Sequence, residues 1–168
     1  ASEALGDLQE ALLERGALRI ELVDDDALGC EKSVQLAGGL LKRISLELGG
    51  NNAFVVLDDA DLEAAASAGA FASFQFQGQV CFATGRHIVH RSVAGRYVDL
   101  LVEKANRLRL GDPYREEVDL GPIVNQKQLD RVDGIVRRSI EGGARVVTGG
   151  THDGLFYRPT VLADVTTR

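Results

Sequence analysis

Short apolar runs alternate with amphipathic helical patterns along most of this chain. The run "AFVVLDD" is continuous and apolar, which is typical of a strand buried in a parallel or layered sheet, and the helix-like stretch "ADLEAAASAGAFASF" follows it. The stretches "RISLEL", "RHIVH", "ARVVTGG" and "FYRPTVL" also indicate strands. This alternation predicts an α/β fold in which helices flank a sheet in three layers. With 168 residues, the chain has the length of one ordinary domain.

Capping residues mark where several of the expected helices begin. Asp58 and Asp59 are predicted to cap the helix that follows "AFVV", and Ser92 is predicted to cap the next one. Asn125, with Gln128 three residues later, resembles a capping box at the start of a helix that ends before two glycines. Further helices are expected over residues 2–15 and 32–42, from apolar residues at helical spacing.

Composition excludes several classes of function. The net charge is −6, and no block of lysine or arginine stands out, which argues against a nucleic-acid partner. No apolar run approaches the roughly 20 residues that cross a bilayer, so no membrane span is expected. The two cysteines, Cys30 and Cys81, and the three histidines lack metal-ligand spacing. We therefore expect no metal site, and free thiols in a reducing cytoplasm.

Glu47 in "LELGG" and Cys81 in "GQVC" are the candidates for chemistry. Each has an ordinary interpretation: a cysteine between Val80 and Phe82 is usually a small core residue, and a glutamate before two glycines can be the polar end of a strand. The functional alternative is that Gly78 permits a bend that exposes the sulfur. The carboxylate would then lie at the sheet edge where ligands of open α/β folds bind, and serve as a general base.

The two motifs together, in this order and 34 residues apart, resemble those of the aldehyde dehydrogenase superfamily. The match continues through "VVLDDADLEAA" and "RLRLGDPYREEVDLGPIVNQKQLDRV" to "FYRPTVL". The stretches "ELGGNNA" and "TGRHIVH" are most similar to the branch that contains benzaldehyde and vanillin dehydrogenases.

The resemblance implies different catalytic roles for Cys81 and Glu47. Cys81 would attack the aldehyde as a thiolate to give a thiohemiacetal, with its own backbone amide in the oxyanion hole. Hydride would pass to NAD or NADP, and Glu47 would activate water to hydrolyse the resulting thioester. Four more residues are implied in the site: Leu48 and Gly49 beside the cofactor, and Gln79 and Phe82 on the substrate side.

The resemblance also divides the chain and shows where it departs from the family. Residues 1–41 resemble the last unit of the cofactor-binding domain, and residues 42–168 resemble part of the catalytic domain. Where the family has a phosphate-binding turn, this chain has "VDDDALGC", whose three aspartates would repel a pyrophosphate or form a solvated helix cap. Family members are about three times longer, so a sheet edge and face should be uncovered unless a second copy or a complementary chain packs there.

Two alternatives to an NAD(P)-dependent oxidoreductase of small aldehydes stay open. One is a non-catalytic truncated homologue or interaction module that keeps the fold. The other is a cofactor-independent thiol esterase, because a cysteine and a glutamate can hydrolyse an activated ester without a hydride step. His87 and His90 have no carboxylate partner at catalytic spacing, so we expect them to be structural or exposed.

Overall fold

The computed structural model describes residues 17–21, 35, 38–40, 43–47 and 50–165. These residues belong to two compact units, residues 1–50 and 51–168, each of which is described by itself. The helix predicted over residues 2–15 and the acidic turn at residues 24–26 lie outside the described residues. The division predicted from the family resemblance, at residues 41 and 42, stays a prediction.

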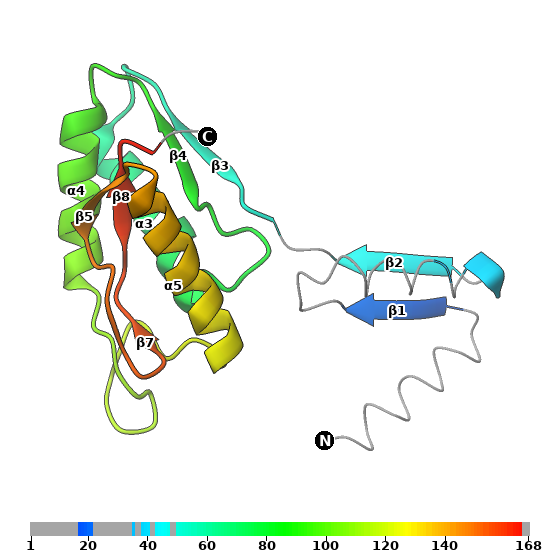
Figure 1. The fold of residues 1–168 in the computed structure, drawn as a ribbon. Coiled ribbons are helices and arrows are strands. Elements are labelled where there is room, and N and C mark those ends of the chain that lie inside the picture. Colours follow the sequence, from blue (N-terminus) through cyan, green and yellow to red (C-terminus); the bar gives the residue numbers. More distant parts are fainter. Residues whose placement is uncertain (1–16, 22–34, 36–37, 41–42, 48–49, 166–168) are drawn as a thin grey trace. The chain divides into compact units, whose positions relative to one another are not determined.

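In the first unit, two strands form a parallel pair (Figure 1). Strand β1 spans Ala17–Glu21 and β2 spans Arg43–Glu47, and in their register Ala17 lies opposite Arg43 and Glu21 opposite Glu47. Strand β2 was expected from "RISLEL". Of the residues that connect β1 and β2, Gln35, Gly38 and Gly39 are helical, and a helix is the usual crossover between parallel strands.

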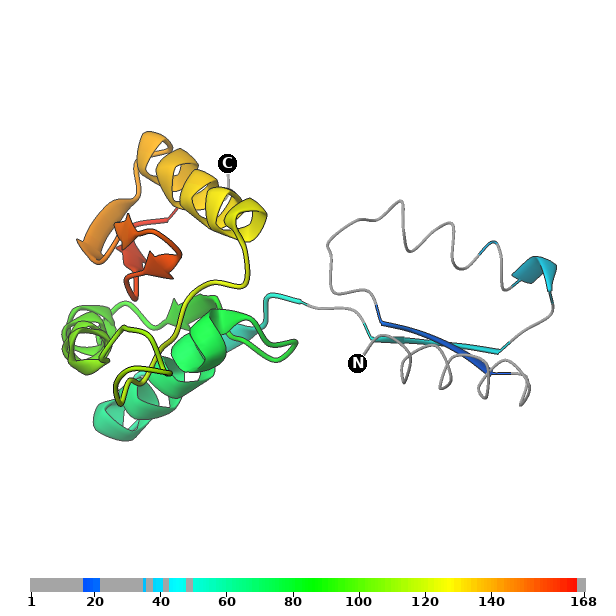
Figure 2. The same ribbon diagram turned by 90° about the horizontal axis from the view of Figure 1, so that it is seen from below.

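The second unit contains both helical and strand elements in the expected alternation. Strand β3 (Ala53–Val56) pairs in parallel with β4 (Arg86–Val89), and α3 (Leu62–Phe74) and the short 3₁₀ helix η1 (Gln75–Gly78) connect them. Helices α4 (Ala94–Arg107) and α5 (Gln126–Glu141) follow. Two antiparallel pairs follow: β5 (Arg145–Thr148) with β8 (Val161–Ala163), and β6 (His152–Asp153) with β7 (Phe156–Tyr157). Figure 1 labels β5, β7 and β8, and Figure 2 shows the same part of the chain, in orange and red, from below. The α/β fold class is thereby confirmed.

The main core of the second unit lies where α3 and α4 meet the strands. It is formed by buried apolar side chains of β3, α3, α4 and β8, namely Val56, Ala66, Ala70, Tyr97, Leu100, Leu101, Ala105 and Val161. A second cluster joins α5 to the end of the chain and contains Ile123, Leu129, Val136 and Tyr157. Tyr97, Leu101 and Ala105 of α4 are buried, and Leu108 is its C-terminal cap.

The β3–β4 sheet has one covered and one uncovered face. Phe54 and Val56 belong to or pack against the main core, whereas Val55 and Ile88, which are opposite each other in the register, are 61% and 52% exposed. The expectation that "AFVV" is fully buried is therefore wrong for its outer face. Side chains of a strand alternate between faces, and among the described residues only one face of this sheet is covered. An uncovered face was expected from the departures from the family.

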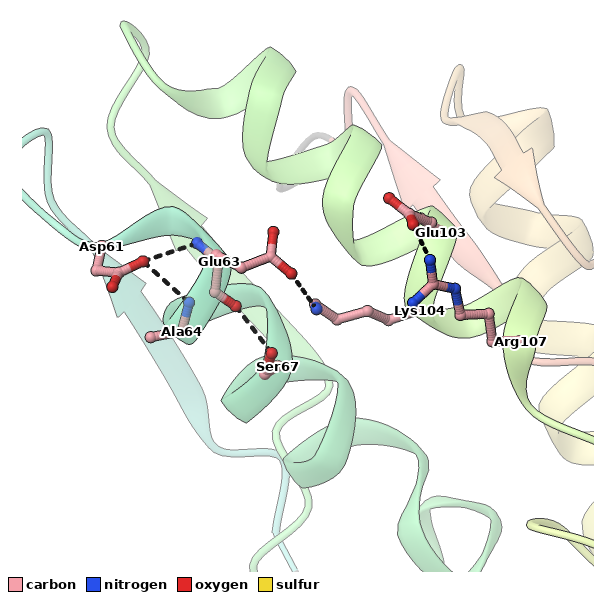
Figure 3. A network of polar contacts seen from close by, with 7 residues as sticks. All are labelled: Asp61, Glu63, Ala64, Ser67, Glu103, Lys104 and Arg107. Atoms are coloured by element: carbon pink, nitrogen blue, oxygen red, sulfur yellow. Dashed lines mark hydrogen bonds and ion pairs between the residues drawn. The ribbon is translucent and has the colours of Figure 1, made fainter.

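The helix starts differ in part from those expected. Asp61, and not Asp58 or Asp59, caps α3, because its Oδ1 accepts hydrogen bonds from the backbone N–H groups of Glu63 and Ala64 at 3.0 and 3.1 Å (Figure 3). Helix α4 begins after Val93 without a side-chain cap, and the Ser92 hydroxyl instead contacts His90 Nδ1 at 2.8 Å.

Helix α5 has the predicted cap, and an ion pair connects α3 with α4. Asn125 caps α5 as expected, since its Oδ1 accepts from the Gln128 N–H at 2.9 Å. Lys104 of α4 contacts Glu63 of α3 at 2.6 Å, as Figure 3 shows. Because Glu63 is largely exposed, this ion pair contributes at most about 1 kcal/mol.

Helices α3 and α4 and strand β4 approach one another closely at Gly69. A Cβ at this position would collide with the Tyr97 hydroxyl and would lie 3.0 Å from His87 Cε1. The Tyr97 hydroxyl is 2.8 Å from His87 Nδ1, so a glycine is needed for the two rings to meet beside α3. His87 is therefore structural, but its partners, Tyr97 and Ser73, were not identified from the sequence.

We expect Gly69→Ala to lower the free energy of unfolding by about 1–3 kcal/mol, because the added methyl group overpacks this contact. In an ordinary helix interior the same change stabilises by up to about 1 kcal/mol. Gly134→Ala in α5 is the matched control, since a Cβ there would meet only the end of the Arg138 side chain at 3.1 Å, which can move. Urea unfolding measures both. Equal stabilisation by the two variants would contradict the packing at Gly69.

Candidate active site

Cys81 is an exposed free thiol in the connection between helix α3 and strand β4. The backbone N–H of Ala83 donates to the carbonyl of Val80 at 3.1 Å, which places Cys81 at the corner of a tight turn. The ordinary interpretation of this cysteine, a small core residue, is not what the structure shows.

The backbone before Cys81 is left-handed over three consecutive residues. Phe76, Gln77 and Gly78 have φ angles of 50°, 58° and 71°. The bend predicted at Gly78 is present, but it begins two residues earlier, at positions where a side chain disfavours this conformation by about 1–2 kcal/mol each. Such strain persists only where surrounding contacts determine the conformation, and it clusters at functional sites.

Two glutamine side chains fix this bend to the loop before α5. Gln79 Oε1 accepts a hydrogen bond from the backbone N–H of Val124 at 3.0 Å. The Gln77 amide oxygen accepts from the backbone N–H of Gly121 at 2.7 Å when the amide is oriented so that its nitrogen donates to the Phe76 carbonyl at 3.0 Å. Gln79, predicted to line the substrate side, thus holds the segment that precedes the thiol.

Asn52 fixes the backbone on the other side of the turn. Its side-chain Nδ2 donates to the carbonyls of Cys81 and Ala83, both at 3.2 Å, and its backbone N–H donates to Ala83 at 3.1 Å. Thr84 is then attached to α3, because its N–H donates to the Ala72 carbonyl at 3.1 Å. The thiol is therefore exposed on a turn whose backbone is held from three directions.

The other predicted residues are described to different extents. Phe82, next to the thiol, is 55% exposed, and its position on the substrate side stays a prediction. Glu47 is the last residue of β2 in the first unit, so its distance from Cys81 in the second unit is not part of what the structure describes. Leu48 and Gly49 lie outside the described residues. The convergence of Glu47 and Cys81 stays a prediction.

Asn52 and Gln77 are the residues that sequence reasoning missed. Asn52 lies in "GGNNA", which pointed only to a branch of the family, although an asparagine just after a glycine pair can hydrogen-bond a neighbouring backbone. Nothing in the sequence signals the left-handed conformation of Gln77. Among the described residues, no group of three or more histidine, cysteine or carboxylate side chains could hold a metal ion, and no helix is long and apolar enough to cross a membrane.

Comparison with known proteins decides the family. The model of the aldehyde dehydrogenase family matches residues 20–168. This chain belongs to the aldehyde dehydrogenase family. The recognition of its glutamate and cysteine motifs is thereby confirmed at the level of the family.

Similar aldehyde dehydrogenases include two that are named for aromatic aldehydes. Vanillin dehydrogenase of Amycolatopsis sp. is 49% identical over 157 residues, which are 94% of this chain and 32% of the relative. Benzaldehyde dehydrogenase [NAD(+)] of Pseudomonas putida is 49% identical over 128 residues, 76% of this chain and 26% of the relative. The chain thus spans about a quarter to a third of these curated relatives.

Solved structures of the family share the fold. Lactaldehyde dehydrogenase from Escherichia coli superposes with a TM-score of 0.80 at 33% identity, covering 89% of this chain and 31% of that one. A mutant of aldehyde dehydrogenase C from Pseudomonas syringae, determined with NAD+ and octanal, superposes with a TM-score of 0.82 at 31% identity, covering 90% and 32%. These matches confirm that the α/β fold is that of part of an aldehyde dehydrogenase.

We expect Asn52→Ala to lower the free energy of unfolding by about 1–2 kcal/mol, because it removes both side-chain hydrogen bonds to the turn. Asn51→Ala is the matched control, because Asn51 is also exposed and its side chain makes no hydrogen bond among the described residues. Its effect should stay within about 0.5 kcal/mol. Denaturant unfolding of both variants measures the difference, and indistinguishable stabilities would argue against a fixed turn.

Proposed function

We propose that this chain is the cysteine-bearing part of an aldehyde dehydrogenase that oxidises an aromatic aldehyde to the carboxylic acid with NAD or NADP. The observation that carries the proposal is the exposed Cys81 on a strained turn held by Asn52, Gln77 and Gln79. Turns of this kind present a nucleophile without movement of the backbone. The names of the vanillin and benzaldehyde relatives support an aromatic substrate.

In the proposed first step, the Cys81 thiolate adds to the aldehyde carbon. A C–S bond forms, the carbonyl π pair moves to the oxygen, and protonation of that oxygen gives a thiohemiacetal. Among the described residues, none accepts a hydrogen bond from the backbone N–H of Cys81, so this amide is free to stabilise the developing oxyanion. Phe82 provides an exposed aromatic surface beside the thiol for the substrate.

The thioester would arise when the thiohemiacetal carbon gives up a hydride to NAD(P)+ and its hydroxyl loses a proton, which is the chemistry that the cofactor would supply. Glu47 has the role of general base in the hydrolysis of this thioester. Water attacks the acyl carbon while its proton passes to the carboxylate, and the C–S bond breaks to restore the thiolate. Only four residues lie between Glu47 and Asn52, which contacts the cysteine turn, so the chain connects the two motifs by a short segment. Leu48 and Gly49 of that segment are proposed to lie beside the nicotinamide.

The sequence near the ends of β1 and β2 is acidic, which would oppose the pyrophosphate of the cofactor. Glu21 and Glu47 end the two parallel strands at the same register position, and Asp24, Asp25 and Asp26 follow β1 in the sequence. Ligands of open α/β sheets bind beyond the carboxyl ends of such strands, and a like charge near a pyrophosphate opposes it by on the order of 1 kcal/mol or more. NAD(P) enters the proposal from family membership alone.

Association with a second copy or a complementary chain is also part of the proposal. It is supported by the exposed apolar outer face of the β3–β4 sheet, which contains Val55 and Ile88. Parallel sheets are normally covered on both faces.

The thiol step is tested in a chain carrying Cys30→Ser, so that Cys81 is the only cysteine. We expect iodoacetamide to alkylate Cys81 at the rate of an accessible thiol, and benzaldehyde to slow this alkylation because the thiohemiacetal occupies the sulfur. Benzyl alcohol, which has the same ring and no carbonyl, should give no protection. Intact-protein mass spectrometry measures the rates. A thiol that reacts no faster than a buried one would remove the nucleophile from the proposal.

The general-base step is tested with p-nitrophenyl acetate, whose acyl group Cys81 can take without a cofactor. We expect Glu47→Gln to keep the burst of p-nitrophenol and to slow the steady turnover by about 10²–10⁴-fold, because only deacylation needs the base. Titration with NAD+ and NADP+ separates the candidate functions. Saturable binding supports the dehydrogenase, whereas steady ester turnover without cofactor binding supports the thiol esterase.

A further inference from the structure

His87 of β4 is hydrogen-bonded at both ring nitrogens by residues of two helices. Its Nε2 lies 2.8 Å from Ser73 Oγ of α3, and its Nδ1 lies 2.8 Å from the Tyr97 hydroxyl of α4. The ring also packs against Phe54 of β3, with the ring centroids 5.3 Å apart. One partly buried side chain thus connects four elements of the second unit.

The contacts determine the direction of every hydrogen bond in this chain of residues. Ser73 Oγ is 2.7 Å from the carbonyl of Thr84, which can only accept, so the serine hydroxyl donates to it. Ser73 must then accept from His87 Nε2–H. That same N–H also faces the Thr84 carbonyl at 3.2 Å. In a neutral imidazole Nδ1 is consequently an acceptor, and the Tyr97 hydroxyl donates to it.

The surroundings favour the neutral ring. The groups that face His87 are Phe54 from β3, Ser73 from α3 and Tyr97 from α4, and Tyr97 alone among them titrates. Burial raises the pKa of Tyr97 to about 12, so it stays protonated and able to donate. Burial also lowers the pKa of His87 from its ordinary value of 6.5, while the hydrogen bond to the Thr84 carbonyl opposes this shift.

We propose that neutral His87 is a positioning residue for Cys81, which it acts on through Ser73 and Thr84. Thr84 is three residues beyond Cys81, and its carbonyl receives the last hydrogen bond of the series that begins at Tyr97. Asn52 holds the carbonyls of Cys81 and Ala83, so the His87 series fixes the next residue of the same segment. This inference rests on the proposed role of Cys81 as nucleophile. It adds His87 as a residue that fixes the position of the backbone segment carrying the Cys81 thiol.

The tautomer is tested directly by NMR of protein labelled with ¹⁵N in histidine, with the His87 signals assigned by comparison with His87→Gln. We expect a neutral ring protonated at Nε2 that persists below pH 6.5, the ordinary pKa. A ring protonated at Nδ1, or one that is already charged at neutral pH, would overturn the proposed direction of the series. This measurement does not depend on any activity of the chain.

The positioning role is tested by hydrogen exchange of the peptide that contains Cys81 to Thr84. His87→Phe keeps the packing on Phe54 but donates nothing to Ser73, so exchange in this peptide should be on the order of tenfold faster. His87→Gln retains a donor and should recover part of the protection. His90→Phe is the matched control, because His90 is exposed and contacts Ser92. Helix α5, which packs in a different cluster, should be unchanged in all three variants.

A second readout separates positioning of the thiol from general stability. In the Cys30→Ser chain, benzaldehyde protection of Cys81 should weaken on the order of tenfold in His87→Phe, because attack on a carbonyl needs exact placement. The rate with iodoacetamide alone, which needs only an accessible sulfur, should change less. Equal protection and unchanged exchange in His87→Phe would overturn the inference. Absence of protection in the parent chain would instead overturn the proposed function, while the exchange and NMR results would still decide the role of His87.

The pH dependence of stability provides the last test. Because burial lowers the pKa of His87 in the folded protein, the unfolded chain takes up this proton first as the pH falls. The stabilisation is present above pH 6.5 and decreases as the pH falls toward the lower folded value. The free energy of unfolding of the parent should therefore fall more steeply below pH 6.5 than that of His87→Phe, and parallel curves would contradict a neutral buried ring.

Discussion

The contact of Tyr97 and His87 with helix α3 at Gly69 is the constraint on which the second unit depends. It brings α4 and β4 against α3 at a distance that only a glycine permits. The segment that contains Cys81 leaves α3 and returns as β4, so both of its ends are fixed by this contact. The conformation of the turn, including its two left-handed non-glycine residues, follows from this closure together with the contacts of Gln77 and Gln79.

The regular elements were predictable because their signals are local. The apolar run "AFVV" and the alternation of strands and helices gave the fold class, and Asn125 marked the start of α5 from its side chain alone. The cap of α3 was missed because Asp58, Asp59 and Asp61 can all accept backbone N–H groups. Which of them does so depends on where the backbone turns, and the turn is set by packing rather than by residue type.

The motif residues of the site were predictable, whereas the residues that hold them were not. Cys81 and Glu47 are marked by glycines and by their spacing. Ser73 and Asn52 contact the segment from Cys81 to Thr84, and Tyr97 contacts His87, only because the chain folds back. Polar residues at such separations carry no periodic signal. Phe76 and Gln77 even oppose their conformation, since a bulky side chain disfavours positive φ. Sites are where local preference and the global fold are expected to disagree.

The exposed apolar outer face of the β3–β4 sheet also bears on the choice of salt conditions for this protein. Val55 and Ile88 occupy adjacent exposed apolar positions on a short parallel ribbon, and the proposed association would cover them. Kosmotropic salts would strengthen association through this face, and dilute solutions at low ionic strength would weaken it. Kosmotropic salts therefore suit crystallisation, which needs contacts between molecules, and low ionic strength suits turnover measurements, which need them dispersed.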